Sequence, residues 1–100
     1  MKIDKNEIKI GGEMTFFCKL DITKSGKFRL EYAIDFMKGN GKTSRKIFQI
    51  KEGFYKLGEL SFHKKHSFRE MTTRKHYAGR HKLSIVINGI EMEIVPFSLE

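Results

Sequence analysis

Apolar side chains at every second position, over two long stretches, most limit what this chain can fold into. In the first stretch the apolar positions are Met14, Phe16, Cys18, Leu20 and Ile22. In the second they are Phe28, Leu30, Tyr32, Ile34 and Phe36. A period of two is typical of a strand with one face on the core and one in solvent. The sequence therefore predicts half-buried strands over residues 14–22 and 28–36.

Shorter stretches predict further strands. Weak alternation covers residues 2–10, and short apolar patterns occupy residues 47–50, 57–62, 82–87 and 90–94. Asn88-Gly89 predicts a type I′ hairpin between the last two, because that turn needs positive φ at two consecutive residues. No segment longer than about ten residues shows a 3.6-residue apolar period. We therefore expect an all-β chain, an immunoglobulin-like β-sandwich of about seven antiparallel strands.

The last predicted strand bears on whether the chain is an enzyme. Alternation there places Ile90, Met92 and Ile94 on the buried side, and it places Glu91 and Glu93 in solvent. A catalytic general acid needs a raised pKa, which requires burial. The sequence also holds no G-x-S-x-G, H-E-x-x-H or paired C-x-x-C motif. We therefore expect no catalytic residue and no cofactor in this domain.

An immunoglobulin-like fold assigns structural roles to three residues. Many such domains have a tyrosine near the start of the sixth strand, two residues before a bridging cysteine. Here His81 stands in the tyrosine's place and Leu83 in the cysteine's, whereas Cys18 stands in the place of the other cysteine. Because Cys18 is the only cysteine, no internal disulfide is possible and Leu83 is expected to pack near it. A free thiol and the absence of any apolar run of about 20 residues favour a cytoplasmic protein without a membrane span.

Most of the excess positive charge lies in one segment, residues 63–82. Seven lysines and arginines and one acid, Glu70, give it a formal charge of +6, out of +8 for the chain. The segment also holds all four histidines, spaced as His63-x-x-His66 and His76-x4-His81. Interleaved cations would repel a metal ion, and no cysteine completes a zinc-ligand pattern. We therefore expect an anion-binding segment and no metal site.

Small hydroxyl donors stand beside the cations, as is typical of contacts to phosphate oxygens. A second polar and basic run, residues 42–46, repeats this chemistry. The same residues are compatible with an inert basic surface, or with a module that docks on an acidic protein or a neighbouring domain.

Several segments resemble one known family. They include Leu30 to Lys38, Asn40 to Phe48, His66-Ser67-Phe68, Thr72 to Leu83 and Val86-x-Asn88-Gly89. Together they resemble the C-terminal immunoglobulin-like domain of the AlkC-type DNA alkylation repair glycosylases, over about residues 12–98. Ala78 stands where the family pattern has proline.

The resemblance implies a DNA-binding accessory domain, residues 1–98, of a longer base excision repair protein. Residues 99–100 are then expected to be a scar from an expression vector. The family's catalytic pocket lies in an N-terminal domain of HEAT-like repeats, and the immunoglobulin-like domain helps to hold duplex DNA, here expected to be damaged. We expect the chain to be a monomer.

Two groups of residues form the expected DNA contacts. The resemblance, with the basic run that it contains, indicates Lys42, Thr43, Ser44, Arg45, Lys46, Thr72, Thr73, Arg74 and His76. Charge alone adds Lys64, Lys65, Arg69 and Lys75. Cys18, His81, Leu83, Asn88 and Gly89 are expected to be structural.

Overall fold

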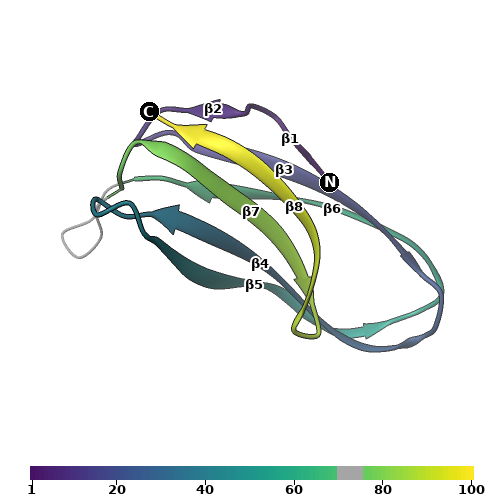
Figure 1. Ribbon diagram of the computed structural model, residues 1–100. Helices are drawn as coiled ribbons and strands as arrows, with labels where there is room; N and C mark the ends of the chain where they lie inside the picture. The colour runs from purple at the N-terminus through teal and green to yellow at the C-terminus, as the bar shows by residue number, and fades with distance from the viewer. Residues whose placement is uncertain (70–75) are drawn as a thin grey trace.

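Two β-sheets pack against each other in the computed structural model, which describes residues 1–69 and 76–100 (Figure 1). The strands are β1 (Lys2–Ile3), β2 (Glu7–Ile8), β3 (Glu13–Ile22), β4 (Gly26–Met37), β5 (Thr43–Tyr55), β6 (Gly58–Ser67), β7 (Gly79–Ile87) and β8 (Ile90–Leu99). One sheet has the order β1-β3-β6, and the other has the order β2-β8-β7-β4-β5. Among the described residues no helix is long and apolar enough to cross a membrane. The predicted all-β, immunoglobulin-like sandwich without a disulfide is confirmed.

The stretch predicted as one weak strand, residues 2–10, is divided between the two sheets. β1 pairs antiparallel with β3, placing Lys2 opposite Phe17. β2 pairs with the end of β8, placing Ile8 opposite Leu99, and this pairing is parallel. The beginning of the chain therefore joins the edges of both sheets. The antiparallel pattern that we predicted holds for every other strand pair of the described residues.

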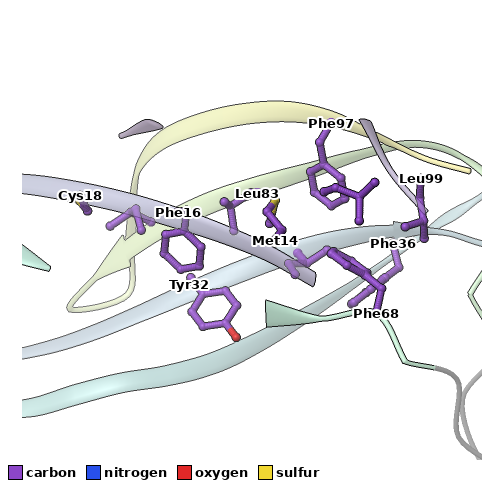
Figure 2. Packing of buried hydrophobic residues seen from close by; sticks show 12 residues of the cluster. Met14, Phe16, Cys18, Tyr32, Phe36, Phe68, Leu83, Phe97 and Leu99 are labelled. Carbon is purple, nitrogen blue, oxygen red and sulfur yellow. The ribbon is translucent and has the colours of Figure 1, made fainter. Parts of the chain in front are cut away.

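The core lies between the inward faces of β3, β4 and β7 (Figure 2). Alternation placed Met14, Phe16 and Cys18 on the inner side of β3, and all three are at most 5% exposed. Cys18 and Leu83 belong to the same buried cluster, as the immunoglobulin pattern predicted. Leu99, expected to be a vector scar, is 1% exposed in this cluster, so the packed domain extends to that residue.

The outer face of the five-stranded sheet is also partly buried. Ala33 and Ser84 are fully buried there although they point away from the core. The register explains this burial, because Ala33 lies beside Ile47 and Ser84 lies beside Ile94. Two short side chains on interior strands are thus covered by longer ones on the neighbouring strands.

The predicted burial of the last strand is wrong. Ile90, Met92 and Ile94 are 64%, 57% and 54% exposed. The register between β7 and β8 shifts at Ile85/Val86. The extra residue reverses the facing beyond it, so Ile94 lies beside the outward-facing Ser84, whereas Ile90 still lies beside Ile87 and is exposed at the end of its strand.

Candidate nucleic-acid interface

Two segments that are far apart in sequence meet at one end of the sandwich, which we call the loop end. It consists of the β4–β5 loop, Lys38–Lys42, together with residues 68–69 and 76–79 (Figure 1). The ring of Tyr77 packs on Gly39 so closely that an added Cβ would lie 3.0 Å from a ring carbon. The contact brings the basic run at residues 42–46 next to the end of the more strongly basic segment.

His81 fixes the geometry of the loop end. Its Nδ1 accepts a hydrogen bond from the backbone N–H of Met37, at 3.1 Å. Its Nε2 lies 3.0 Å from the carbonyl oxygen of Tyr77, four residues upstream. Both bonds can form together only when the ring is neutral with its proton on Nε2. His81 is 1% exposed, and burial lowers its pKa below the usual value. The predicted corner role of His81 agrees with this geometry.

Two more histidines are buried beneath the loop end. The ring of His76 stacks on Phe36 at 5.5 Å between centroids, and that of His66 lies 4.8 Å from Phe68. The Tyr32 hydroxyl lies 2.9 Å from Nδ1 of His66. His76 was predicted to contact DNA, but it is only 4% exposed, so its position favours support of the loop end over direct contact. Sequence reasoning missed the burial of His66, since a histidine that directly follows two lysines gives no sign of it.

The exposed fourth histidine, His63, points away from His66. Their strand, β6, places His63 beside Phe17 on the outer face, whereas His66 lies beside Met14 on the inner face. An odd spacing along a strand puts two side chains on opposite faces. The His63-x-x-His66 pair is therefore unable to hold one metal ion between its rings in this conformation.

Internal hydrogen bonds shape the β4–β5 loop. The N–H of Lys38 donates to the carbonyl of Lys42 at 2.8 Å, and the N–H of Gly41 donates to that of Lys38 at 3.0 Å. The Asn40 side chain accepts from the N–H of Lys42 at 3.0 Å, and Gly41 has a φ of 81°. A closed turn presents Lys38 and Lys42 in solvent beside Thr43. Lys38 was not among the predicted contacts; its place at the start of a glycine-rich turn was the available signal.

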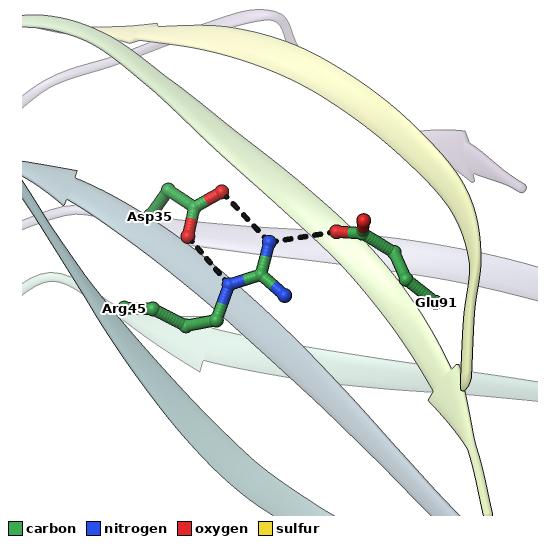
Figure 3. A network of polar contacts seen from close by, with 3 residues as sticks. All are labelled: Asp35, Arg45 and Glu91. Atoms are coloured by element: carbon green, nitrogen blue, oxygen red, sulfur yellow. Dashed lines mark hydrogen bonds and ion pairs between the residues drawn. The ribbon is translucent and has the colours of Figure 1, made fainter. Parts of the chain in front are cut away.

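Arg45 is already bound to two carboxylates (Figure 3). Its Nε and Nη2 donate to the two oxygens of Asp35 at 2.7 and 3.1 Å, and Nη2 also donates to Glu91 at 2.7 Å. Hydrogen bonding to Arg45 lowers the pKa of the Asp35 carboxyl. The network lies on the outer face of the five-stranded sheet and joins β4, β5 and β8. Arg45 was predicted to contact phosphate, but its charge is compensated within the fold.

The other predicted contacts are divided among different surfaces. Lys46 lies beside Ile34, and Lys64 lies beside Phe16, so both are on the inner side of the two edge strands β5 and β6. Ser44 shares that side with Lys46, since the two are two residues apart. Lys65 points to the opposite face of β6, where its Nζ lies 3.3 Å from Glu13. The predicted contacts Thr72, Thr73, Arg74 and Lys75 lie outside the described residues.

Among the predicted contacts, cations without an ion pair to another described residue lie at two places. Arg69 and Lys42 are exposed near the loop end, and Lys46 and Lys64 lie along the open side between β5 and β6. In the described part of the chain, none of the four has an ion pair. Arg45 and Lys65 differ from them in having a carboxylate partner.

Comparison with known proteins shows what the chain is similar to. It is 39% identical over 93 residues to the uncharacterized protein YhaZ of Bacillus subtilis (strain 168). This match covers 92% of this chain and 26% of YhaZ. A solved structure of the Pseudomonas fluorescens alkylpurine DNA glycosylase AlkC, bound to DNA containing an abasic site analog, matches with a TM-score of 0.91 and 29% identity. That match covers 98% of this chain and 28% of the AlkC chain. A β-glucosidase from Listeria innocua in complex with glucose matches with a TM-score of 0.72 at 10% identity, over 98% of this chain and 15% of that one, and it shows the fold alone.

These matches confirm the resemblance to the AlkC-type immunoglobulin-like domain. The chain spans about a quarter of the length of YhaZ and of AlkC. Residues 1–100 match the family described as the C-terminal Ig-like domain of the uncharacterised protein YhaZ. The chain therefore belongs to the YhaZ C-terminal immunoglobulin-like domain family, to which the immunoglobulin-like part of AlkC is closely similar in structure.

Proposed function

We propose that this chain is a non-catalytic DNA-binding domain of an alkylation-repair DNA glycosylase, and that it contacts the phosphate backbone of duplex DNA. The observation that carries the proposal is the similarity, over nearly the whole chain, to an AlkC structure that holds DNA. The unpaired cations of the loop end support it. In this proposal a HEAT-like repeat domain earlier in the parent protein performs base excision, and the protein acts in the cytoplasm as a monomer.

The proposed contact set consists of four predicted DNA contacts that have no carboxylate partner among the described residues. They are Lys42 and Arg69 near the loop end, and Lys46 and Lys64 along the open side of the sandwich. Residues 72–75 follow shortly after Arg69 in the sequence, and they are proposed as contacts from their sequence alone. A cation that keeps an internal carboxylate partner neutralises less phosphate charge, so it releases fewer counterions from the DNA. Arg45 and Lys65 are therefore proposed to contribute less to DNA affinity.

The carboxylates of the described residues support a non-catalytic role. Asp35 is held in an ion pair with Arg45, and its pKa is lowered, the opposite of what a general acid requires. Most other acids lie on exposed strand faces. A domain that contacts only phosphates would position a partner on DNA without reading its sequence.

Titration of the chain with labelled duplex DNA at several salt concentrations tests the proposal. If the four cations of the described residues each neutralise one phosphate, they contribute about −3.6 to the slope of log K against log salt, at about −0.9 per contact. Lys42→Ala and Arg69→Ala should each reduce the slope by about 0.9, because each removes one contact. Arg45→Gln is the matched control: it also removes one positive charge, but from a side chain with internal partners.

Three results would contradict the proposal. They are an absence of binding at low salt, a slope near zero, or a loss in Arg45→Gln equal to that in Lys42→Ala. The first two would favour the competing function, a module that docks on an acidic protein.

A further inference from the structure

One edge of β3 is mostly unoccupied. On one side, β3 pairs with β6 along all ten of its residues, from Glu13 to Ile22. On the other side β1 pairs only with Phe16 and Phe17, so the edge from Cys18 to Ile22 has no strand partner in the described part of the chain. Figure 1 shows β1 as a short segment beside the much longer β3. An exposed strand edge is a template for another strand.

Hydrogen bonding near β1 identifies the backbone groups that face this edge. Asp4 donates its N–H to the carbonyl of Thr15 at 2.9 Å, and the N–H of Thr15 donates to the side chain of Asp4 at 3.0 Å. Backbone groups alternate sides along a strand, so the odd-numbered residues of β3 face β1. Further along the strand, Lys19 and Asp21 therefore present their N–H and C=O groups to the open edge.

Two hollows adjoin the open edge. The first, of about 400 Å³, is lined by residues that include Met1, Phe17 and Lys19. The second, of about 550 Å³, is lined mainly by apolar side chains near the three strand connections at the end opposite the loop end, and Lys19 lines it as well. Ile90 and Met92 at its mouth are more than half exposed.

A buried hydroxyl group also marks the second hollow. Tyr55 lines it, and the oxygen of its side chain is buried without a hydrogen-bond partner among the described residues. Leaving a buried polar group without a partner destabilises the fold, so native structures usually provide one. Together with the exposed apolar side chains, this hydroxyl indicates a surface that another segment covers.

The direction of β1 indicates which segment this is. Its register pairs Lys2 with Phe17 and Ile3 with Phe16, so the chain runs away from the open edge as the numbers rise. Followed backward, the same register would place the residue two before Lys2 opposite Lys19, and the residue two before that opposite Asp21. A preceding segment would thus run along the open edge toward the second hollow.

We propose that residues preceding Met1 in the parent protein extend β1 along Cys18–Ile22 and place apolar side chains over the second hollow. This rests on the proposal that the chain is one domain of a longer protein, but it does not depend on DNA contact. The relatives are long enough to hold such a segment, since this chain spans 26% of YhaZ and 28% of AlkC and its family is described as C-terminal. A covalently attached strand has an effective concentration that an unattached peptide lacks. The parent's N-terminal part is therefore coupled to this domain by strand pairing as well as by the covalent link.

Amide hydrogen exchange of the 100-residue chain and of the longer native gene product, followed by NMR, tests the inference. Lys19 and Asp21 should exchange fast in the short chain and at least tenfold more slowly in the longer product. Leu20 and Ile22 are internal controls, because their amides face β6 and should be protected in both. Substituting proline for the residue two places before Lys2 should restore fast exchange at Lys19, because proline lacks the N–H that this pairing needs.

Several results would overturn the inference. One is equally fast exchange of Lys19 and Asp21 in both proteins, and another is a native gene product that begins at Met1. Protection of the two amides that grows with the concentration of the short chain would identify a second copy as the occupant. DNA binding is measured in a separate titration. If the longer product does not bind DNA but its Lys19 and Asp21 amides are protected, the proposed function is rejected and this inference stands.

Discussion

Replacement of His81 gives the sharpest test of how the loop end is held. The side chain joins the backbone of Met37, at the end of β4, to the carbonyl of Tyr77, and its ring stacks on Phe97 at 5.5 Å between centroids. In His81→Ala, one N–H and one C=O lose their partners, at about 1–3 kcal/mol each, and a cavity opens beside Phe97. We expect a loss of about 3–5 kcal/mol. A small domain has only about 5–15 kcal/mol of stability, so this variant should be near unfolding.

His81→Gln separates the hydrogen bonds from the ring. Glutamine has one acceptor and one donor at its end, so it can partly replace both bonds, and we expect a smaller loss of about 1–2 kcal/mol. His81→Gln also removes the ionisable imidazole, because glutamine does not titrate. Burial lowers the pKa of His81 in the folded chain, whereas in the unfolded chain the pKa is about 6.5. Below pH 6.5 the unfolded chain binds a proton that the folded chain refuses, so acidification reduces the stability of the wild type by up to about 1.4 kcal/mol per pH unit.

Urea unfolding of the wild type and both variants, between pH 8 and pH 5, measures these effects. The difference in unfolding free energy between the wild type and His81→Gln should be constant above about pH 7.5 and should shrink as the pH falls through 6.5. All other ionisable groups are the same in both proteins, so their contribution to the pH dependence cancels to first order. A loss below about 1 kcal/mol in His81→Ala, or a wild-type difference that does not change with pH, would refute the reasoning.

Three further substitutions test other parts of the fold by the same urea measurement. Arg45→Gln should cost only about 0.5–1 kcal/mol, because the Arg45 side chain is 42% exposed and water screens its ion pairs; a loss above 3 kcal/mol would contradict this. Asn88→Ala should cost about 1–2 kcal/mol, since Asn88 has a φ of 50° and its side chain accepts from the N–H of Arg29 at 2.8 Å; no change would show that the turn does not need asparagine. Gly79→Ala should cost about 1–3 kcal/mol, because its φ is 141° and the new Cβ would clash with the sulfur of Met37; a neutral result would mean that this segment adapts easily.

The sequence predicted strands best where one face of the strand rests on the core. In β3 and β4 the period of two matched the burial of Met14, Phe16 and Ile34 because the facing never changes along the inner side of these strands. In β8 it failed, since no residue type marks the extra residue at which the register shifts. The edge strand β5 extends well beyond the predicted residues 47–50, because an edge strand has few buried positions to produce a pattern.

Charge alone could not distinguish free from compensated cations. Arg45 and Lys46 are adjacent and carry the same charge at neutral pH, but only Arg45 meets a carboxylate, and one of its partners lies 46 residues away. That contact depends on β7 and β4 lying between β8 and β5, which is a property of the topology. The burial of His76 was hidden for the same reason, as it depends on the approach of Phe36 from another strand.

The parallel pairing of β2 with the end of β8 determines how the domain would respond to mechanical tension. Three backbone hydrogen bonds join the two segments: Ser98 to Asn6 at 2.7 Å, Glu100 to Ile8 at 2.8 Å and Ile10 to Glu100 at 2.7 Å. Tension that draws the two ends of the chain apart pulls these parallel strands in opposite directions along their length. The bonds are then sheared together, whereas a hairpin pulled open from its ends loses its bonds one at a time. The domain is thus built to resist stretching between its ends most strongly where its first and last strands meet.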